Sequence, residues 1–233
     1  MKLKNKVIGI IGIIAILSII LIGGYKNNYQ PTKNTQQTSN AQQTSNLYDC
    51  EDYLILVNKQ NSIDGDYIPQ HLVKVNIKFL DDTQEESRCM EKEAAEAVED
   101  LFACAKKEGI TLIGSSAYRS YQSQVRVLKE QTYKKGYDYA MTHVAQPGQS
   151  EHQSGLAIDI TNEVRCFDKT SKEAQWLAKN AHKFGFILRY PEGKEKVTGY
   201  DFEPWHIRYV GKDVAKEIYK NGITLEEYLK NKA

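Results

Sequence analysis

The chain has 233 residues, with 31 lysines and arginines against 30 aspartates and glutamates, which gives a formal net charge of +1 at pH 7. Because these charges nearly cancel and no basic stripe is interleaved with aromatic residues, nucleic acid is not an expected partner. About 180 residues follow a polar N-terminal stretch, which is enough for one domain with its own hydrophobic core.

The N-terminus combines positive charge with an apolar run. Lysines at positions 2, 4 and 6 precede the 18 residues 7–24, which contain one hydroxyl group and no charge. This length predicts a single-pass membrane helix, and the lysines favour a cytoplasmic start with export of the remainder. A cleaved secretory signal, which would release the chain, is the alternative, although no convincing small-residue cleavage site follows Leu21. We therefore expect residues 1–24 to form a cytoplasmic stub and an anchor in the cell membrane.

The next segment, 25–49, is almost entirely polar, and the sequence QQTSN at 36–40 is repeated at 42–46. Such a segment has too little apolar surface to offset the entropy lost on ordering it. We predict that 25–49 is a disordered linker. The remaining residues, 50–233, are then one folded domain.

Hydrophobic periodicity predicts an alternation of strands and helices in this domain. Strands are expected at 53–57, 73–79, 110–113, 156–160, 186–190 and 205–210. Helices are expected at 94–105, which Gly109 would end, at 121–135 and 172–184, and twice more near the C-terminus. This order indicates a single α+β domain, with an antiparallel or mixed sheet covered by helices and a cleft on the open face.

Two short segments carry the residues for a metal site, SEHQSGLAID at 150–159 and EPWHIRY at 203–209. Catalytic zinc takes three histidine or carboxylate ligands and leaves a fourth position for water. We assign His152, Asp159 and His206 as these ligands. The other histidines have no partner at ligand spacing and are left out of the site: His71, His143 and His182.

A hydrolytic site of this kind also needs a base that collects a proton from the attacking water. Glu203 stands three residues before His206 and is the candidate for that base. Because Pro204 disfavours a helical conformation at the residue before it, we expect an extended stretch that places Glu203 beside the metal without ligating it.

These patterns, S-x-H-x-x-G-x-A-x-D followed by E-x-W-H-x-R-Y, resemble the VanY-type zinc D-alanyl-D-alanine carboxypeptidases, within the wider D-Ala-D-Ala metallopeptidase group. The segment SAYRSY at 116–121 resembles the arginine motif of that family, LVNK at 56–59 its opening strand, and FILRYP at 186–191 the strand ahead of the last ligand. The resemblance covers about 53–209 and is unbroken at every position expected to bind metal or activate water.

The resemblance implies a set of roles for residues of this chain. It places zinc on His152, Asp159 and His206, and the general base on Glu203. It gives Arg119 the role of an oxyanion-binding or carboxylate-binding group, which suits a charge that develops in a transition state. Gln124 and Ser150 are expected to hydrogen-bond the substrate. The expected partners are peptidoglycan stem peptides, and the expected state is a monomer.

Competing hydrolase mechanisms lack their motifs. The Ser-x-x-Lys tetrad of serine carboxypeptidases and the His-Glu-x-x-His helix of zincins are both absent from the sequence. Three hypotheses remain: a D,D-carboxypeptidase that removes the terminal D-alanine, an L,D-carboxypeptidase on tetrapeptide stems or an endopeptidase with the same site, and a non-enzymatic wall-binding module. Retention of Glu203 argues against the last, because a binding module needs no base.

Four cysteines, at positions 50, 89, 104 and 166, lie in the part expected outside the cytoplasm, where disulfides persist. If Cys89 and Cys104 share one helix, 15 residues separate them by roughly 22 Å, too far for a disulfide. Two bridges would then require Cys50 to pair with one of these two residues.

Overall fold

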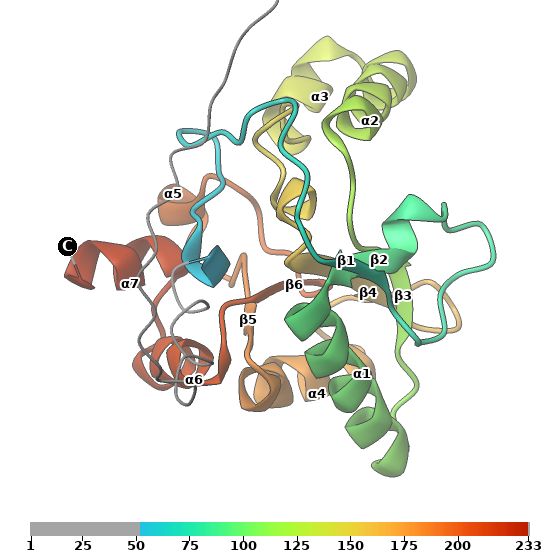
Figure 1. The fold of residues 1–233 in the computed structure, drawn as a ribbon, viewed down its shortest axis with the longest axis vertical. Coiled ribbons are helices and arrows are strands. Elements are labelled where there is room, and N and C mark those ends of the chain that lie inside the picture. Colours follow the sequence, from blue (N-terminus) through green and yellow to red (C-terminus); the bar gives the residue numbers. More distant parts are fainter. Residues whose placement is uncertain (1–51, 233) are drawn as a thin grey trace, which may run out of the picture. The chain divides into compact units, whose positions relative to one another are not determined.

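The computed structural model describes residues 52–232 (Figure 1). This part of the chain contains two antiparallel sheets flanked by helices. The larger sheet has the strand order β3 (Ile113–Ser116), β4 (Ala157–Thr161), β6 (His206–Tyr209) and β5 (Phe186–Leu188); in the smaller one β1 (Leu72–Lys74) pairs with β2 (Cys89–Glu91). The predicted α+β class is confirmed, and of the two expected sheet types the antiparallel one is present.

The helices of the described residues include both long helices expected from sequence periodicity. In chain order they are α1 (Lys92–Lys107), α2 (Tyr121–Lys135), α3 (Tyr137–His143), α4 (Lys172–Asn180), α5 (Glu195–Thr198), α6 (Lys212–Asn221) and α7 (Leu225–Lys232). Gly109, in a left-handed conformation at φ +75°, follows the end of α1 as predicted. The helix expected at 172–184 is shorter, because α4 changes into the 3-10 helix η4 (Ala181–Phe184). The short helices α3 and α5 were not predicted.

Within residues 52–232, none of the helices has the length and apolar character needed to cross a bilayer. The predicted anchor at 1–24 and linker at 25–49 lie outside the described residues.

The main core lies between the larger sheet and helices α1 and α4, which pack on one of its faces (Figure 1). Val98 and Leu101 of α1 are fully buried there, with Leu177 of α4. From the sheet, Ile158 and Ile207 are equally buried. Each such side chain contributes about 1.5–3 kcal/mol relative to an exposed one, so this face fixes the orientation of the strands.

Strand alternation then determines what the opposite face presents. Ile158 and Ile160 of β4 enter the core, so Asp159 between them points to the other side. In β6, Ile207 enters the core, and His206 and Arg208 point away from it. The face of the sheet that is free of α1 therefore carries the polar residues of both strands.

A second core supports the C-terminal helices. Ala215 and Ile218 of α6 pack with Leu225 and Tyr228 of α7 around Ile187 of β5. This cluster attaches α7 to the strand that ends just before Arg189.

Three predicted strands differ from the structure. Residues 53–57 form no strand, and the first of them belong to the 3-10 helix η1 (Asp52–Leu54). Their carbonyls accept hydrogen bonds from a side chain and not from a neighbouring strand: Arg208 Nη2 donates to Tyr53 O at 2.9 Å and to Ile55 O at 2.8 Å. The strand expected at 73–79 is limited to β1, with one isolated bridge between Phe79 and Gly114. The strand expected at 110–113 begins only at Ile113, where pairing with β4 starts.

The cysteine prediction rested on a wrong placement. Cys89 lies in β2, ahead of α1, so it does not share a helix with Cys104. Cys89, Cys104 and Cys166 carry free thiols. Cys50 lies outside the described residues, and the other three cysteines form no disulfide with one another.

Candidate active site

Asp159 and His206 are brought together by sheet register. They are direct partners in the antiparallel pair of β4 and β6, and both point away from the core. Cross-strand partners have Cβ atoms about 4.5–5.5 Å apart, so their side chains meet. In the structure His206 Nδ1 lies 2.9 Å from Asp159 Oδ1.

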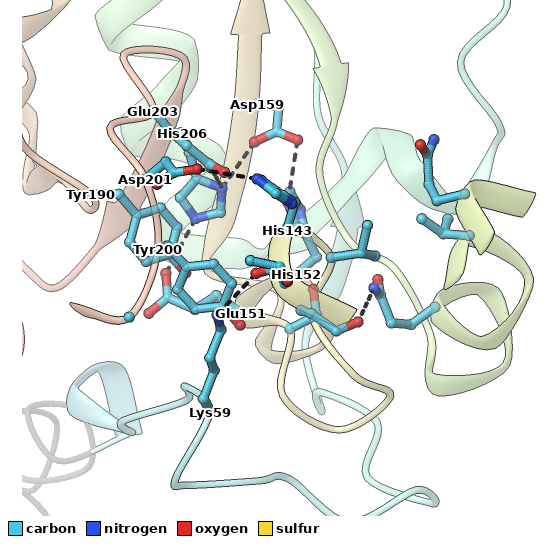
Figure 2. Close-up of a pocket in the computed structure, with 18 of the residues that line it drawn as sticks. Lys59, His143, Glu151, His152, Asp159, Tyr190, Tyr200, Asp201, Glu203 and His206 are labelled. Carbon is cyan, nitrogen blue, oxygen red and sulfur yellow. Dashed lines mark hydrogen bonds and ion pairs between the residues drawn. The ribbon is translucent and has the colours of Figure 1, made fainter. Parts of the chain in front are cut away.

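His152 reaches the same point from a different element, the 3-10 helix η3 (Glu151–Ser154) (Figure 2). Its Nδ1 lies 2.7 Å from the carbonyl oxygen of Ala117. Because a carbonyl can only accept, Nδ1 carries the proton and Nε2 is left with a lone pair. That Nε2 lies 3.3 Å from Asp159 Oδ2. The backbone carbonyl of His152 accepts from Arg119 N at 3.2 Å, which fixes η3 against the chain that follows β3.

Gly155 ends η3 in a left-handed conformation, with φ +71°. A Cβ atom there would lie 3.0 Å from Leu72 Cδ2 and 3.3 Å from the backbone nitrogen of Glu91. We expect Gly155→Ala to lower the free energy of unfolding by about 1–3 kcal/mol through backbone strain. The close contacts of the new Cβ atom should lower it further. The control is Gly193→Ala, at φ +83° with no neighbour within 4 Å. Equal losses in urea unfolding would contradict the role of the contacts.

The three predicted ligands form a group suited to a metal ion. One ligand atom from each of His152, Asp159 and His206 lies within 4.8 Å of the others. Burial alone raises the pKa of Asp159, but the two histidines outweigh it and hold this pKa well below its usual range. Burial and Arg119 lower the pKa of His152. Burial alone lowers the pKa of His206, but hydrogen bonds with Asp159 and Glu151 outweigh it and raise this pKa to about 9. An ionised carboxylate and a neutral imidazole are the forms that bind metal, so metal binding must displace a proton from His206.

Glu203 lies beside this group, with Oε2 4.0 Å from His206 Nδ1. Burial, assisted by the charge of Asp159, raises the pKa of Glu203 to about 7 despite the nearby imidazole. The segment is not extended as predicted. Glu203 O accepts from His206 N at 3.3 Å, which closes a turn with Pro204 at its second position, where proline is favoured. The turn gives the expected proximity by a different backbone path.

Arg119 also lies beside the ligand group, next to Asp159. Its Nη2 donates to Ser116 Oγ at 2.8 Å and lies 4.0 Å from Asp159 Oδ2, and its Nη1 donates to Gln124 Oε1 at 3.0 Å. Gln124 Nε2 donates in turn to Ala145 O at 2.7 Å. Gln124 therefore holds the guanidinium in place.

One cleft of about 490 Å³ contains the site, a volume within the usual range for small-ligand sites. Every predicted site residue contributes to it: Arg119, Gln124, Ser150, His152, Asp159, Glu203 and His206. Other residues of the lining were not predicted. They include Lys59, Tyr200 and the pair His143 and Asp201, whose Nε2 and Oδ2 lie 3.7 Å apart (Figure 2).

The family of the chain follows from comparison with known proteins. Residues 87–212 match the model of the family described as VanY, D-alanyl-D-alanine carboxypeptidase. The chain belongs to the VanY family. A D-alanyl-D-alanine carboxypeptidase of Enterococcus faecalis (strain ATCC 700802 / V583) is 40% identical over 186 residues, which are 76% of this chain and 65% of that protein. The chain thus spans about two thirds of the length of this relative.

Solved structures of VanY-like enzymes share the fold. The LD-carboxypeptidase LdcB has a TM-score of 0.70 and 43% identity, over 75% of this chain and 84% of that one. A vancomycin resistance D,D-pentapeptidase VanY in complex with Zn(II) has a TM-score of 0.63 and 38% identity, over 77% and 99%. These values support the family assignment made from the sequence motifs.

One buried part of this VanY-family site was missed by the sequence analysis. Glu151, next to the ligand His152, is fully buried between Arg189 and Arg208. Burial alone would raise the pKa of Glu151, but the two guanidinium groups outweigh it and hold the carboxyl far below its usual pKa. The available signal was the strand period, because Arg208 stands two residues after His206 and so lies on the same face of β6.

Proposed function

We propose that this protein is a zinc D,D-carboxypeptidase that releases the terminal D-alanine from peptidoglycan stem peptides. The observation that carries the proposal is the convergence of His152, Asp159 and His206, with Glu203 4.0 Å from the last of them. Two imidazoles and one carboxylate suit zinc and leave a position open toward the cleft. When bound, zinc supplies a Lewis acid that polarises a carbonyl group and makes water more acidic.

The roles of the protein groups follow from their positions. Glu203 accepts a proton from the attacking water and later returns it to the leaving amine, and its raised pKa suits both transfers. Arg119, held by Ser116 and Gln124, stabilises the negative charge that develops on the former carbonyl oxygen or binds the substrate carboxylate. Its partly desolvated setting strengthens that interaction.

Replacing Arg119 with alanine should lower kcat/KM by about 10²–10³-fold while zinc remains bound, because the guanidinium acts on the transition state and ligates no metal. Steady-state kinetics with a stem pentapeptide and metal analysis check both parts. The control is Arg126→Ala, since Arg126 is an exposed arginine on α2 that pairs with Glu86. An unchanged rate in Arg119→Ala would assign this residue a purely structural role.

A second activity is supported by the likeness to the LD-carboxypeptidase LdcB. An L,D-carboxypeptidase would use the same metal site on a tetrapeptide stem, and an endopeptidase would cut between stems. The deciding experiment incubates the zinc-loaded protein from residue 47 onward with pentapeptide and tetrapeptide stems, and identifies the released amino acid by chiral analysis. Release of D-alanine from the pentapeptide alone supports the D,D activity, and release from the tetrapeptide alone supports the L,D activity. No release despite bound zinc would favour a non-enzymatic wall-binding role.

We also propose that residues 1–24 anchor the enzyme in the cell membrane with its catalytic part outside the cytoplasm. The apolar run and the lysines before it support this placement. The full-length protein should sediment with membranes after a high-salt wash and be accessible to protease added to intact protoplasts. Recovery of a shortened protein in the culture medium would instead show that the segment is a cleaved signal.

A further inference from the structure

A chain of buried charges connects the metal site with the C-terminal helix. His206 Nε2 lies 3.3 Å from Glu151 Oε2. Glu151 Oε1 accepts from Arg189 Nε and from Arg208 Nη1, each at 2.7 Å. Arg189 then donates through Nη1 and Nη2 to Glu226 of α7, at 2.9 Å and 2.6 Å. Glu151 thus contacts the predicted metal ligand His206 at the ring nitrogen opposite the one that faces Asp159 (Figure 2).

The contact between Glu151 and His206 determines which ring nitrogen faces the other ligands. An ionised carboxylate can only accept, so Nε2, the nitrogen nearest Glu151, carries a proton. By the same rule Nδ1 donates to Asp159 at 2.9 Å, and a metal ion held by Asp159 and His206 would take the place of that second proton while Nε2 keeps its own. Carboxylates behind metal-ligating histidines fix the ring orientation in this way and raise the basicity of the ligand.

The charges of this buried series of ion pairs are balanced. Two glutamates, Glu151 and Glu226, neutralise two arginines, Arg189 and Arg208. Arg208 also donates through Nη2 to the carbonyls of residues 53 and 55 and through Nε to the carbonyl of Tyr209. Each guanidinium therefore has acceptors on more than one side, and Glu151 has little freedom to move away from His206.

We propose that Glu151 is a positioning residue that holds His206 with Nδ1 toward the metal, and that Glu226 of the C-terminal helix α7 secures this arrangement through Arg189. The proposal rests on the metal site of the proposed function. It assigns α7, whose residues contribute nothing to the cleft lining, a role in metal binding.

The test compares zinc affinity, measured by competition with a chromophoric chelator, in the wild type and in Glu151→Gln. Glutamine offers one oxygen to three donors and turns an NH₂ group toward either an arginine or the imidazole. We expect zinc affinity to fall by about 10–100-fold, the usual effect of losing such a contact. The visible absorption bands of the Co²⁺-loaded protein should also change, since they report the ligand geometry. Unchanged affinity and an unchanged Co²⁺ spectrum would overturn the positioning role.

Glu226→Gln tests the link to α7, and its zinc affinity can be measured even if Glu151→Gln fails to fold. We expect a loss of zinc affinity in the same direction and of smaller size. Glu227→Gln is the matched control, because Glu227 is the next residue of α7 and pairs with Lys194. Equal zinc affinity in Glu226→Gln and Glu227→Gln would overturn the link, even if Glu226→Gln lowers the melting temperature.

Zinc binding by the wild type tests the metal site separately from the roles of Glu151 and Glu226. A wild-type protein that binds no zinc would contradict the proposed metal site itself. A wild type that binds zinc, together with variants that bind it equally well, would contradict only the roles of Glu151 and Glu226.

Discussion

Replacing Glu203 with glutamine is expected to lower kcat by about 10²–10⁴-fold while zinc remains bound. The carboxylate lies 4.0 Å from His206 Nδ1, and Glu203 is not one of the three residues whose ligand atoms lie within 4.8 Å of one another, so its loss removes a proton acceptor and not a metal ligand. Stopped assays of D-alanine release, combined with metal analysis of the same preparation, check both statements. Near-normal turnover in Glu203→Gln would remove this residue from the mechanism.

The same group should set the acidic limb of the rate profile. Glu203 must be ionised to accept a proton, so kcat/KM should fall as the pH drops through its pKa. Burial raises that pKa to about 7, and zinc beside the carboxyl favours the charged form, so the limb should lie below pH 7. Glu203→Gln should lose this limb in its residual activity. A limb that persists in the variant belongs to another group.

Replacing His206 with alanine is expected to abolish both zinc binding and turnover. The substitution removes one of three ligands, and it also leaves the buried Glu151 without its imidazole partner. Zinc content after dialysis against a weak chelator should fall to the level of a protein without a site. Activity should fall to the background rate, because the attacking water then lacks the metal that acidifies it.

The control for that experiment is His71→Ala, a histidine with an exposed side chain outside the catalytic cleft. This variant should keep its zinc and its turnover. Zinc retained at the wild-type level in His206→Ala would show that the ion is bound elsewhere, and the proposed ligand set would then be wrong.

The sequence was sufficient where local chemistry and spacing decide the outcome. The motif residues His152, Asp159 and His206 could be selected because few residue types bind zinc, and the structure brings their ligand atoms within 4.8 Å. The helix α2 was predicted to the residue, since Ser120 caps its first turn and Gly136 follows its last residue. The strand that carries Asp159 was predicted at 156–160, within one residue of β4 at each end.

Other features depend on which distant segments meet, and sequence periodicity carries no information on that. Residues 53–57 look like a strand by their apolar character, yet Arg208, more than 150 positions later, takes up two of their carbonyls. His143 and Asp201 were not paired by any spacing, and they meet only because α3 lies beside the loop before β6, where both residues line the cleft.

What the sequence by itself determined was the family, the set of residues able to bind zinc, and the glutamate beside them. Only the tertiary structure decided the surroundings of these residues. They are the turn that brings Glu203 to His206, the hydrogen bond that leaves Nε2 of His152 unprotonated, and the buried ion pairs of Glu151. The physical reason is that ligand chemistry belongs to each residue type, whereas the burial of Glu151 between two arginines is stable only when β5, β6 and η3 have already packed together.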